Sequence, residues 1–281
     1  MILIADSGRT KMEWCVLDGA EVVKHTVTPS INTMIVTEEE MSQFFTDVVK
    51  PCFEGFKIDY VYFYGAGCLG GEINARVARA LMNIVDDNTV VEVNSDLLGA
   101  ARALCAREPG IACILGTGSN SCLYDGAEII EHVSPLGYVL GDEGSGAVLG
   151  RLLLGNVLKK QFPEYLCEAF HREYQLDTKD ILQRVYHEPL PNAFLASVSR
   201  FLLSYIEEPA VHRLVLNEFK AFFVRNVVHY TGYKELPVNF TGSIAYNYID
   251  VLQEAAAAVD CNLGKVTASP MEGLIAYHTQ A

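Results

Sequence analysis

The strongest constraint on the fold is a strand–turn–strand pattern that occurs twice. Residues 1–17 run as an apolar strand, a polar turn at 7–11 and a second strand. Residues 111–124 repeat this order around Gly116-Thr-Gly-Ser-Asn120. Both hairpins continue into nearly identical segments, Leu17-Asp-Gly-Ala-Glu-Val-Val23 and Tyr124-Asp-Gly-Ala-Glu-Ile-Ile130. Because Asp-Gly is a strong turn signal, each copy predicts a three-stranded meander. The chain is therefore predicted to use one unit twice.

The polar turn of each hairpin is a candidate anion site. Closely spaced glycines let the backbone bend sharply and direct consecutive N–H groups at one anion. In the second turn Thr117, Ser119 and Asn120 add side-chain donors. A glycine-rich turn between two strands is also an ordinary hairpin. Each turn by itself is consistent with a phosphate site or with a plain chain reversal.

Length and charge narrow the classes of protein. The 281 residues have room for two domains, and Glu108-Pro-Gly110 is the best candidate boundary, which predicts domains at 1–107 and 108–281. The formal net charge of −14 argues against a nucleic-acid or anionic-membrane partner, because either would favour a basic face. An acidic protein can still bind a nucleotide if a local backbone nest and a metal ion supply the positive field.

The rest of the chain alternates strands and helices, which predicts an α/β fold with mixed sheets. In the first half we expect strands at 59–64 and 89–93 and helices at 38–49, 72–85 and 97–105. After a polar, glycine-rich loop at 134–146, we expect helices at 147–158, 164–173, 178–187, 192–206 and 209–231. Short strands at 237–240 and 264–267 precede helices that run from 241 to 259 and from 270 to 278.

The eight cysteines are scattered without a C-x-x-C pair, and the seven histidines show no metal-ligand spacing. The first residues already form a strand and lack the pattern of a secretory leader. No apolar run reaches the ~18 residues of a membrane span. These features lead us to expect a cytoplasmic protein with reduced thiols.

Five short motifs, in order, resemble the N-acetylglucosamine kinase and BadF-type ATPase family. They are Asp6-Ser-Gly-Arg-Thr-Lys11, Asn94-Ser-Asp96, Ile114-Leu-Gly-Thr-Gly-Ser-Asn120, Gly141-Asp-Glu-Gly-Ser145 and Thr241-Gly-Ser-Ile-Ala245. The resemblance spans nearly the whole chain and places it in the superfamily of sugar kinases, actin and chaperone ATPases. It implies two ribonuclease H-like domains with an interdomain cleft that closes on substrate. The second domain is enlarged by helices, and the C-terminal helix can pack back on the first.

The resemblance implies ATP and Mg²⁺ as cofactors. Asp6 matches the acid that helps to hold the metal, although a carboxylate there could simply order its own turn. This chain has Ser7 and Arg9 where glycines are usual, which weakens a pure backbone cradle. The departure either lets Arg9 reach the phosphates instead or marks a relaxed nucleotide site. The strand-to-helix turn at 242–245 suits adenosine, or is a plain turn capped by its serine. The expected ATP contacts are Ser7, Gly8, Arg9, Thr10, Lys11, Gly116, Thr117, Gly118, Gly242, Ser243 and Ala245.

Asp96 matches the catalytic aspartate of the family, which takes the proton of the acceptor hydroxyl as that oxygen attacks the γ-phosphate. Independently, an acid after a sheet strand lies where open α/β folds bind ligands. The alternative is an ordinary helix cap, since Asn94, Ser95 and Asp96 precede an apolar helix.

The resemblance also assigns the acceptor sugar to polar and glycine positions. The family lines this region with glycines. In this chain Pro135 replaces one of them, and Gly137 is kept. Paired hydrogen-bonding groups suit a neutral polyol, whose hydroxyls need partners once water is removed. Besides Asp96, the expected sugar-binding residues are Asn32, Gly67, Ser119, Asn120, Gly137 and Asp142.

The leading hypothesis is an ATP-dependent kinase that phosphorylates an amino sugar, with the 6-hydroxyl of N-acetylglucosamine as the first choice. One alternative is a BadF-type activator ATPase of a dehydratase or reductase, which shares an iron–sulfur cluster between subunits. Cys113 and Cys122 flank the second turn on strands and offer no ligand-like pair. The other alternative is a sugar sensor that binds without turnover. The oligomeric state is left open, a homodimer included.

Overall fold

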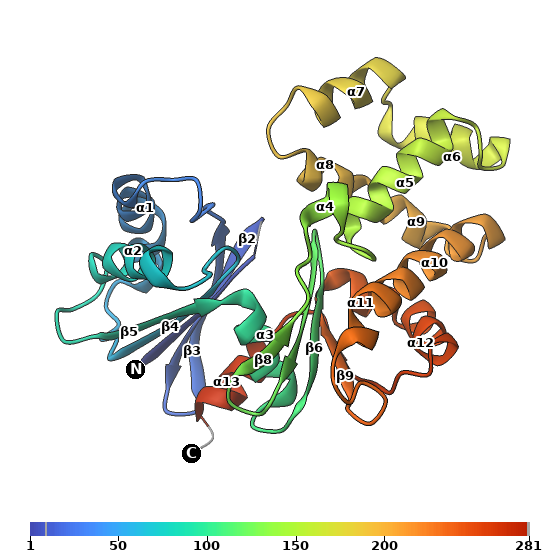
Figure 1. Ribbon diagram of the computed structural model, residues 1–281. Helices are drawn as coiled ribbons and strands as arrows, with labels where there is room; N and C mark the ends of the chain where they lie inside the picture. The colour runs from blue at the N-terminus through green and yellow to red at the C-terminus, as the bar shows by residue number, and fades with distance from the viewer. Residues whose placement is uncertain (9, 280–281) are drawn as a thin grey trace. The chain divides into compact units, whose positions relative to one another are not determined.

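The computed structural model describes residues 1–8 and 10–279. It divides into two compact units. The first unit consists of Met1–Glu108, Gly126–Glu128 and the C-terminal segment from Pro270, and the second of Pro109–Asp125 and Ile129–Ser269. The last helix of the chain thus belongs to the same unit as the first strand (Figure 1).

The first unit is built on a mixed sheet in the order β3-β2-β1-β4-β5. Its strands are β1 (Ile2–Ser7), β2 (Lys11–Asp18), β3 (Glu21–Pro29), β4 (Tyr60–Gly65) and β5 (Val90–Ser95). The first three strands form an antiparallel meander, whereas β4 and β5 join β1 in parallel. Short turns suffice for the antiparallel pairs, and the parallel pairs need the helical crossovers that the sequence predicts.

Helices cover both faces of this sheet (Figure 1). They are α1 (Glu38–Phe44), which continues as a π-helical turn at Phe45–Val49 and a 3₁₀ turn at Lys50–Phe53, then α2 (Gly71–Met82), α3 (Asp96–Cys105) and α13 (Met271–Thr279). On one face Trp14 packs edge-on against Phe45, and its ring centre lies 5.9 Å from that of Phe63. On the other face Leu274 of α13 packs with Ile4. The chain end therefore completes the core around the first strand.

A polar cluster fixes α13 against the sheet and α3. The Tyr64 hydroxyl accepts a hydrogen bond from Arg102 (2.8 Å) and is hydrogen-bonded to Nε2 of His278 (2.8 Å). Arg102 also pairs with Glu92 at 2.9 Å. Burial, with the positive charge of Arg102 as a second cause, lowers the pKa of His278 to about 4, so this imidazole is neutral at pH 7.

The second unit repeats the strand pattern of the first, in the order β10-β9-β6-β7-β8. Its strands are β6 (Gly110–Leu115), β7 (Ser119–Tyr124), β8 (Ile129–His132), β9 (Val238–Thr241) and β10 (Leu263–Thr267). Again three strands form an antiparallel meander, and two further strands add in parallel next to its first strand. The predicted α/β fold with a doubled meander is confirmed.

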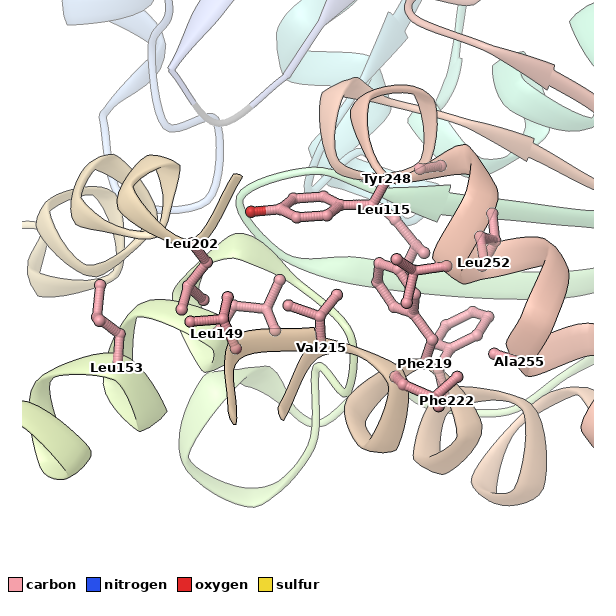
Figure 2. Close-up of a cluster of buried hydrophobic side chains, with 14 of the residues drawn as sticks. Leu115, Leu149, Leu153, Leu202, Val215, Phe219, Phe222, Tyr248, Leu252 and Ala255 are labelled. Atoms are coloured by element: carbon pink, nitrogen blue, oxygen red, sulfur yellow. The ribbon is translucent and has the colours of Figure 1, made fainter. Parts of the chain in front are cut away.

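Most of the second unit is helical. Its helices are α4 (Gly137–Leu140), α5 (Gly146–Leu158), α6 (Glu164–Tyr174), α7 (Thr178–Tyr186), α8 (Pro191–Val198), α9 (Arg200–Ser204), α10 (Pro209–Arg225), a 3₁₀ turn at Val227–His229, α11 (Ser243–Asn247) and α12 (Ile249–Ala258). Figure 2 shows the core that they share with the sheet. Phe219 and Phe222 of α10 are fully buried there with Leu115 of β6 and Leu252 of α12.

Three long helices predicted in this unit end earlier than expected. The helix predicted at 192–206 is two helices that meet at Ser199, whose hydroxyl donates to the Ala196 carbonyl (2.8 Å) and competes with the backbone. The helix predicted at 209–231 ends at Arg225, where the side-chain amide of Asn226 donates to the Phe222 carbonyl. The helix predicted to end at 259 is interrupted at Tyr248. The loop predicted at 134–146 contains the single turn α4.

The two Asp-Gly segments form turns of different length. In the first, β2 ends at Asp18 and β3 begins at Glu21, with Gly19 at φ +59°. In the second, four residues separate β7 from β8, and Gly126 has φ +102°. A Cβ on Gly126 would lie 2.4 Å from the Arg107 carbonyl oxygen, so this glycine permits a close backbone contact. Equal local sequences are here given different shapes by their neighbours.

Within the described part of the chain, no helix combines the length and the apolar character that crossing a membrane requires. Each of the eight cysteines, all of which lie in that part, is a free thiol.

Two helical glycines give a matched test of how closely α13 packs. A Cβ on Gly273 would lie 2.2 Å from the Ala103 carbonyl oxygen of α3, whereas a Cβ on Gly155 of α5 meets nothing within 4 Å. We predict that Gly273→Ala lowers the free energy of unfolding by about 1–3 kcal/mol because the helices must separate. Gly155→Ala should raise it by up to about 1 kcal/mol. Urea denaturation of both variants measures the difference, and equal effects would contradict the close packing.

Candidate active site

The carboxyl ends of three parallel strands meet at one edge of the first sheet. Ser7 of β1 pairs with Gly65 of β4, and Gly65 pairs with Ser95 of β5. The β1–β2 turn, the loop after β4 and the start of α3 therefore leave the sheet side by side. This is the edge at which open α/β sheets bind ligands.

The first turn is tight and is braced from a neighbouring loop. The Gly8 N–H donates to the Lys11 carbonyl (3.0 Å), and the Ser30 hydroxyl donates to the Gly8 carbonyl. Ser7 is buried, and Thr10 and Lys11 are exposed. Arg9, which is also expected to bind ATP at this turn, lies outside the described residues. An ammonium and a hydroxyl are thus available at this end of the sheet.

Asp6 lies next to this turn in an acidic setting. It faces Glu13 across the β1–β2 pair. The pKa of the Asp6 carboxyl is raised to about 7, mainly by burial and also by the negative charges of Asp96 and Glu13, while Lys11 acts in the opposite direction. Asp6 and Asp96, predicted to be the metal ligand and the base, therefore interact electrostatically.

These oxygen donors fit a magnesium ion, because a hard cation prefers carboxylates and would relieve their mutual repulsion. Asp6 would hold the ion directly. Among the described residues no group of three or more histidine, cysteine or acidic side chains is placed to hold a metal. The remaining ligands would then be phosphate oxygens and water, as is usual for magnesium at nucleotides.

Asp96 is the first residue of α3, and the role of helix cap belongs to Ser95. The Ser95 hydroxyl accepts a hydrogen bond from the Leu98 N–H (3.1 Å), which is the N-cap contact. One oxygen of Asp96 accepts from the Leu97 N–H (2.9 Å), and its side chain is half-buried. Ser95 thus makes the N-cap contact, and the Asp96 carboxylate accepts from one N–H of the first turn.

The loops that carry Asn32 and Gly67 are joined to each other. The Thr33 hydroxyl lies 3.4 Å from the Ala66 carbonyl oxygen, and a Cβ on Gly67, which has φ +88°, would lie 2.9 Å from Met34. Asn32 is exposed, and its side-chain oxygen accepts from the Met34 N–H (3.1 Å). The amide nitrogen of Asn32 is thus the end that the turn does not use.

In the second unit the glycine-rich turn is held by the start of a helix. The Gly116 N–H donates to the Gly118 carbonyl (2.9 Å). The N–H groups of Gly146 and Ala147 in α5 donate to the carbonyls of Gly116 (2.8 Å) and Thr117 (3.1 Å). These first donors of α5 stabilise the turn, and an anion would have to be bound by the N–H groups of the turn itself.

Ser119 and Asn120 begin β7 directly after this turn. Ser119 is buried, and Asn120 pairs with Ile114 across the hairpin. The side-chain oxygen of Asn120 accepts from the Ser121 N–H (3.0 Å) and is bonded to Nε2 of His132 (2.9 Å). Burial lowers the pKa of His132, which favours the neutral imidazole.

The predicted adenosine segment lies beside the same turn. Thr241 of β9 pairs with Ile114 of β6. Gly242 has φ +115°, and a Cβ there would lie 2.4 Å from the Leu115 carbonyl oxygen. No side chain caps α11, Ser243 is exposed and Ala245 is buried. The fold brings segments 116–118 and 242–245 together within one unit.

Asp142 lies in a strained loop between α4 and α5. It is fully buried and has φ +52°, which is uncommon for a residue other than glycine. Its N–H donates to the Pro135 carbonyl (2.8 Å), and its carbonyl accepts from the Ser145 N–H (3.1 Å). The Gly141 N–H donates to the Gly137 carbonyl (2.7 Å), which brings the predicted Gly137 into the same loop.

Glu143 is the main site residue whose contacts the sequence did not predict. Its carboxylate pairs with Arg225 (2.9 Å) and lies 3.4 Å from the side-chain amide of Asn226. The neighbouring Gly144 N–H donates to the Glu218 carboxylate. These partners lie on α10 or directly after it. The apolar spacing of that helix predicts packing against the core but gives no signal of a polar contact with this loop.

Cys113 and Cys122 bear on an iron–sulfur alternative. Both are fully buried in the β6–β7 hairpin, where Cys113 pairs with Ser121 and Cys122 with Ala112. Because side chains alternate along a strand, the two thiols lie on opposite faces of the sheet. They therefore do not form a common metal site.

Solved structures resemble this chain along nearly its whole length. The putative N-acetylglucosamine kinase of Porphyromonas gingivalis is 48% identical over 99% of both chains, with a TM-score of 0.97. The putative N-acetylglucosamine kinase of Chromobacterium violaceum is 17% identical over 98% of both chains, with a TM-score of 0.73. A ROK family glucokinase from Streptomyces griseus, in complex with glucose and AMPPNP, is 12% identical over 98% of this chain and 97% of its own, with a TM-score of 0.56. At these lower identities the likeness shows the fold alone. No family model and no curated protein matches the chain.

The setting of Asp6 predicts a stability cost that depends on pH. Its pKa in the folded protein, about 7, exceeds the ordinary value of 3.8, so the folded state favours the protonated form. Stability is then lost as the pH rises from about 4 to about 7. We predict that Asp6→Asn raises the free energy of unfolding at pH 8 on the order of 1–3 kcal/mol, with little effect at pH 4.

Chemical denaturation of the ligand-free protein at both pH values measures this difference. Asp87→Asn, on an exposed acid of the same unit, is the control for charge removal. A variant at position 6 that is no more stable than the wild type at pH 8 would show that the carboxylate carries no such cost.

Proposed function

The chain belongs to the N-acetylglucosamine kinase and BadF-type ATPase family of the sugar kinase and actin-like ATPase superfamily, and from this membership we propose that it is an ATP-dependent sugar kinase. It transfers the γ-phosphoryl group of ATP to a hydroxyl of an amino sugar. The proposed acceptor is the 6-hydroxyl of N-acetylglucosamine. The description of the Porphyromonas gingivalis relative, at 48% identity, supports this choice of sugar.

The observation that carries the catalytic assignment is the placement of Asp96. It starts a helix at the carboxyl edge of a parallel strand, beside Asp6, while Ser95 makes the cap contact. A carboxylate at a ligand-binding edge, held by the Leu97 N–H on one oxygen, is suited to act as a general base.

In the proposed reaction Asp96 accepts the proton of the sugar hydroxyl as its oxygen forms a bond to the γ-phosphorus. The bond from this phosphorus to the β–γ bridging oxygen breaks, and its electron pair leaves with ADP. The proton stays on Asp96 until the products are released. Bound through Asp6, a magnesium ion supplies charge neutralisation at the phosphate oxygens.

The nucleotide is bound by residues that each unit offers at a hairpin turn. The N–H groups of Thr117 and Gly118 suit phosphate oxygens, and Lys11 adds a positive charge. Gly8 and Gly116 shape the two turns, because their own N–H groups bond to the carbonyls of Lys11 and Gly118. Arg9 is proposed as a further phosphate contact. Adenosine lies against Gly242, Ser243 and Ala245, in a turn that the close contact of Gly242 with the Leu115 carbonyl holds beside β6.

The sugar is held by donors and acceptors that satisfy its hydroxyls. The amide of Asn32 and the carboxylate of Asp142 are the proposed principal contacts. They come from loops that the fold braces through Thr33 and through Pro135. Gly67, Ser119, Asn120 and Gly137 are the further proposed sugar-binding residues.

Replacement of Asp96 tests the chemistry. We predict that Asp96→Asn lowers kcat by about 10²- to 10⁴-fold, because general-base assistance is lost. The affinity for ATP, measured by calorimetry, should change by less than about twofold, because the side chain stays nearly isosteric. Asp250→Asn, an acid in the first turn of α12, is the matched control and should keep full activity. Full activity of the variant at position 96 would refute its role as base.

The acceptor is tested by a panel of sugars with the intact protein. ADP release should be fastest with N-acetylglucosamine among N-acetylglucosamine, glucosamine, glucose and N-acetylmuramic acid, since a site built for a polar group rejects analogues that leave its partners unpaired. Phosphorus NMR of the product should show a phosphate monoester at the 6-position. Tight binding of a sugar without any ADP release would instead identify a sensor.

A further inference from the structure

The loop at 141–145 holds Asp142 in a conformation that residues other than glycine rarely adopt. Asp142 has φ +52° although it is not a glycine, and it is followed by Gly144 at φ +71°. Such a conformation is costly for a residue other than glycine and persists only where the surrounding structure imposes it. The contacts that impose this one are therefore informative about the site.

Helix α10 and the residue after it supply those contacts. The Glu143 carboxylate is paired with Nε of Arg225 at 2.9 Å on one oxygen and lies 3.4 Å from Nδ2 of Asn226 on the other. The Gly144 N–H donates to the Glu218 carboxylate. Glu143 and Gly144, the two residues that follow Asp142, are thus both held by contacts with α10 or with the residue after it.

The helix itself is anchored in the core. Val215, Phe219 and Phe222 of α10 are fully buried among the helices of the second unit (Figure 2). A packed helix is a rigid support, because buried side chains resist displacement. A loop fixed to such a helix is positioned more accurately than a loop held only by its own hydrogen bonds.

We propose that Glu143, through Arg225, Asn226 and Glu218, positions Asp142 for the acceptor sugar. This inference rests on the proposed function, in which Asp142 binds the sugar, and assigns a role to the helical part of the second unit. Glu143, Glu218 and Arg225 are positioning residues. They set how tightly the sugar binds and leave the phosphoryl transfer step to Asp96.

The exposure of the two charges separates this role from a contribution to stability. The Glu143 side chain is 10% exposed, whereas the Arg225 side chain is 60% exposed. An ion pair with one partner in solvent contributes little to folding. Removal of Arg225 should therefore leave the fold intact. It withdraws a charge from the poorly solvated Glu143, which must move to regain solvent and displaces its neighbour Asp142.

The central experiment compares two arginines of the same helix. Arg225→Gln should raise the KM for N-acetylglucosamine on the order of tenfold, the loss expected for one misplaced hydrogen-bonding group. Its kcat and its KM for ATP should stay within about twofold of the wild type, because the interaction removed concerns sugar binding alone. Arg213→Gln removes the same charge from α10 at an exposed position and should leave all three constants unchanged. Arg225→Lys should recover part of the sugar affinity, because it retains the charge.

A pair of substitutions at Glu218 tests the second contact by conservative rescue. Glu218→Ala removes the acceptor for the Gly144 N–H and should weaken sugar binding. Glu218→Gln keeps a carbonyl oxygen at that place and should restore it. Thermal unfolding of each variant shows whether it is folded at the assay temperature.

The outcomes separate the inference from the proposed function. Equal sugar constants for Arg225→Gln and Arg213→Gln would overturn the inference, as would parallel losses for sugar and ATP. If the wild type releases no ADP with any sugar, the kinase proposal fails. Calorimetric titration of the same variants with N-acetylglucosamine then still decides the inference. A wild type that neither turns over nor binds a sugar would overturn both.

Discussion

Backbone pairing between parallel strands decides where the chemistry of this protein can lie. β1 pairs with β4 and β4 with β5 in a register that brings Ser7, Gly65 and Ser95 to one edge of the sheet. Asp6 and Asp96, which are far apart in the sequence, become electrostatic neighbours at that edge. The pairing of Ile114 with Thr241 brings together the glycine-rich turn and the predicted adenosine segment of the second unit. The candidate residues thus depend on main-chain hydrogen bonds for their position.

The second unit adds close backbone contacts to this arrangement. A side chain on Gly242 would collide with the Leu115 carbonyl, so the adenosine segment can approach β6 only with glycine at this position. The first N–H groups of α5 are used by the carbonyls of Gly116 and Thr117. Helix starts often bind anions directly. Here the helix start shapes the turn, so the proposed phosphate contacts fall to the N–H groups of Thr117 and Gly118.

Local patterns predicted the framework and some of the site. The doubled meander follows from apolar runs and turn residues, and both sheets confirm it. The predicted lengths of two later helices were wrong because side chains compete for backbone carbonyls of the helix. Ser199 donates to the Ala196 carbonyl, and Asn226 donates to the Phe222 carbonyl. The two Asp-Gly segments predicted the same kind of turn, but the observed turns differ in length. The longer turn around Gly126 packs closely against the Arg107 backbone, a contact that the local sequence does not predict.

The amino-acid sequence alone determined the order of strands and helices, the two polar turns and the acid at position 96. Each of these is set by neighbours within a few residues, where periodicity and turn preference act. Only the tertiary structure decided that Ser95 and not Asp96 caps α3, that burial and nearby acids raise the pKa of Asp6, and that Arg225 holds Glu143. Burial and ion pairing depend on which distant residues become neighbours, and a local sequence pattern carries no information about them.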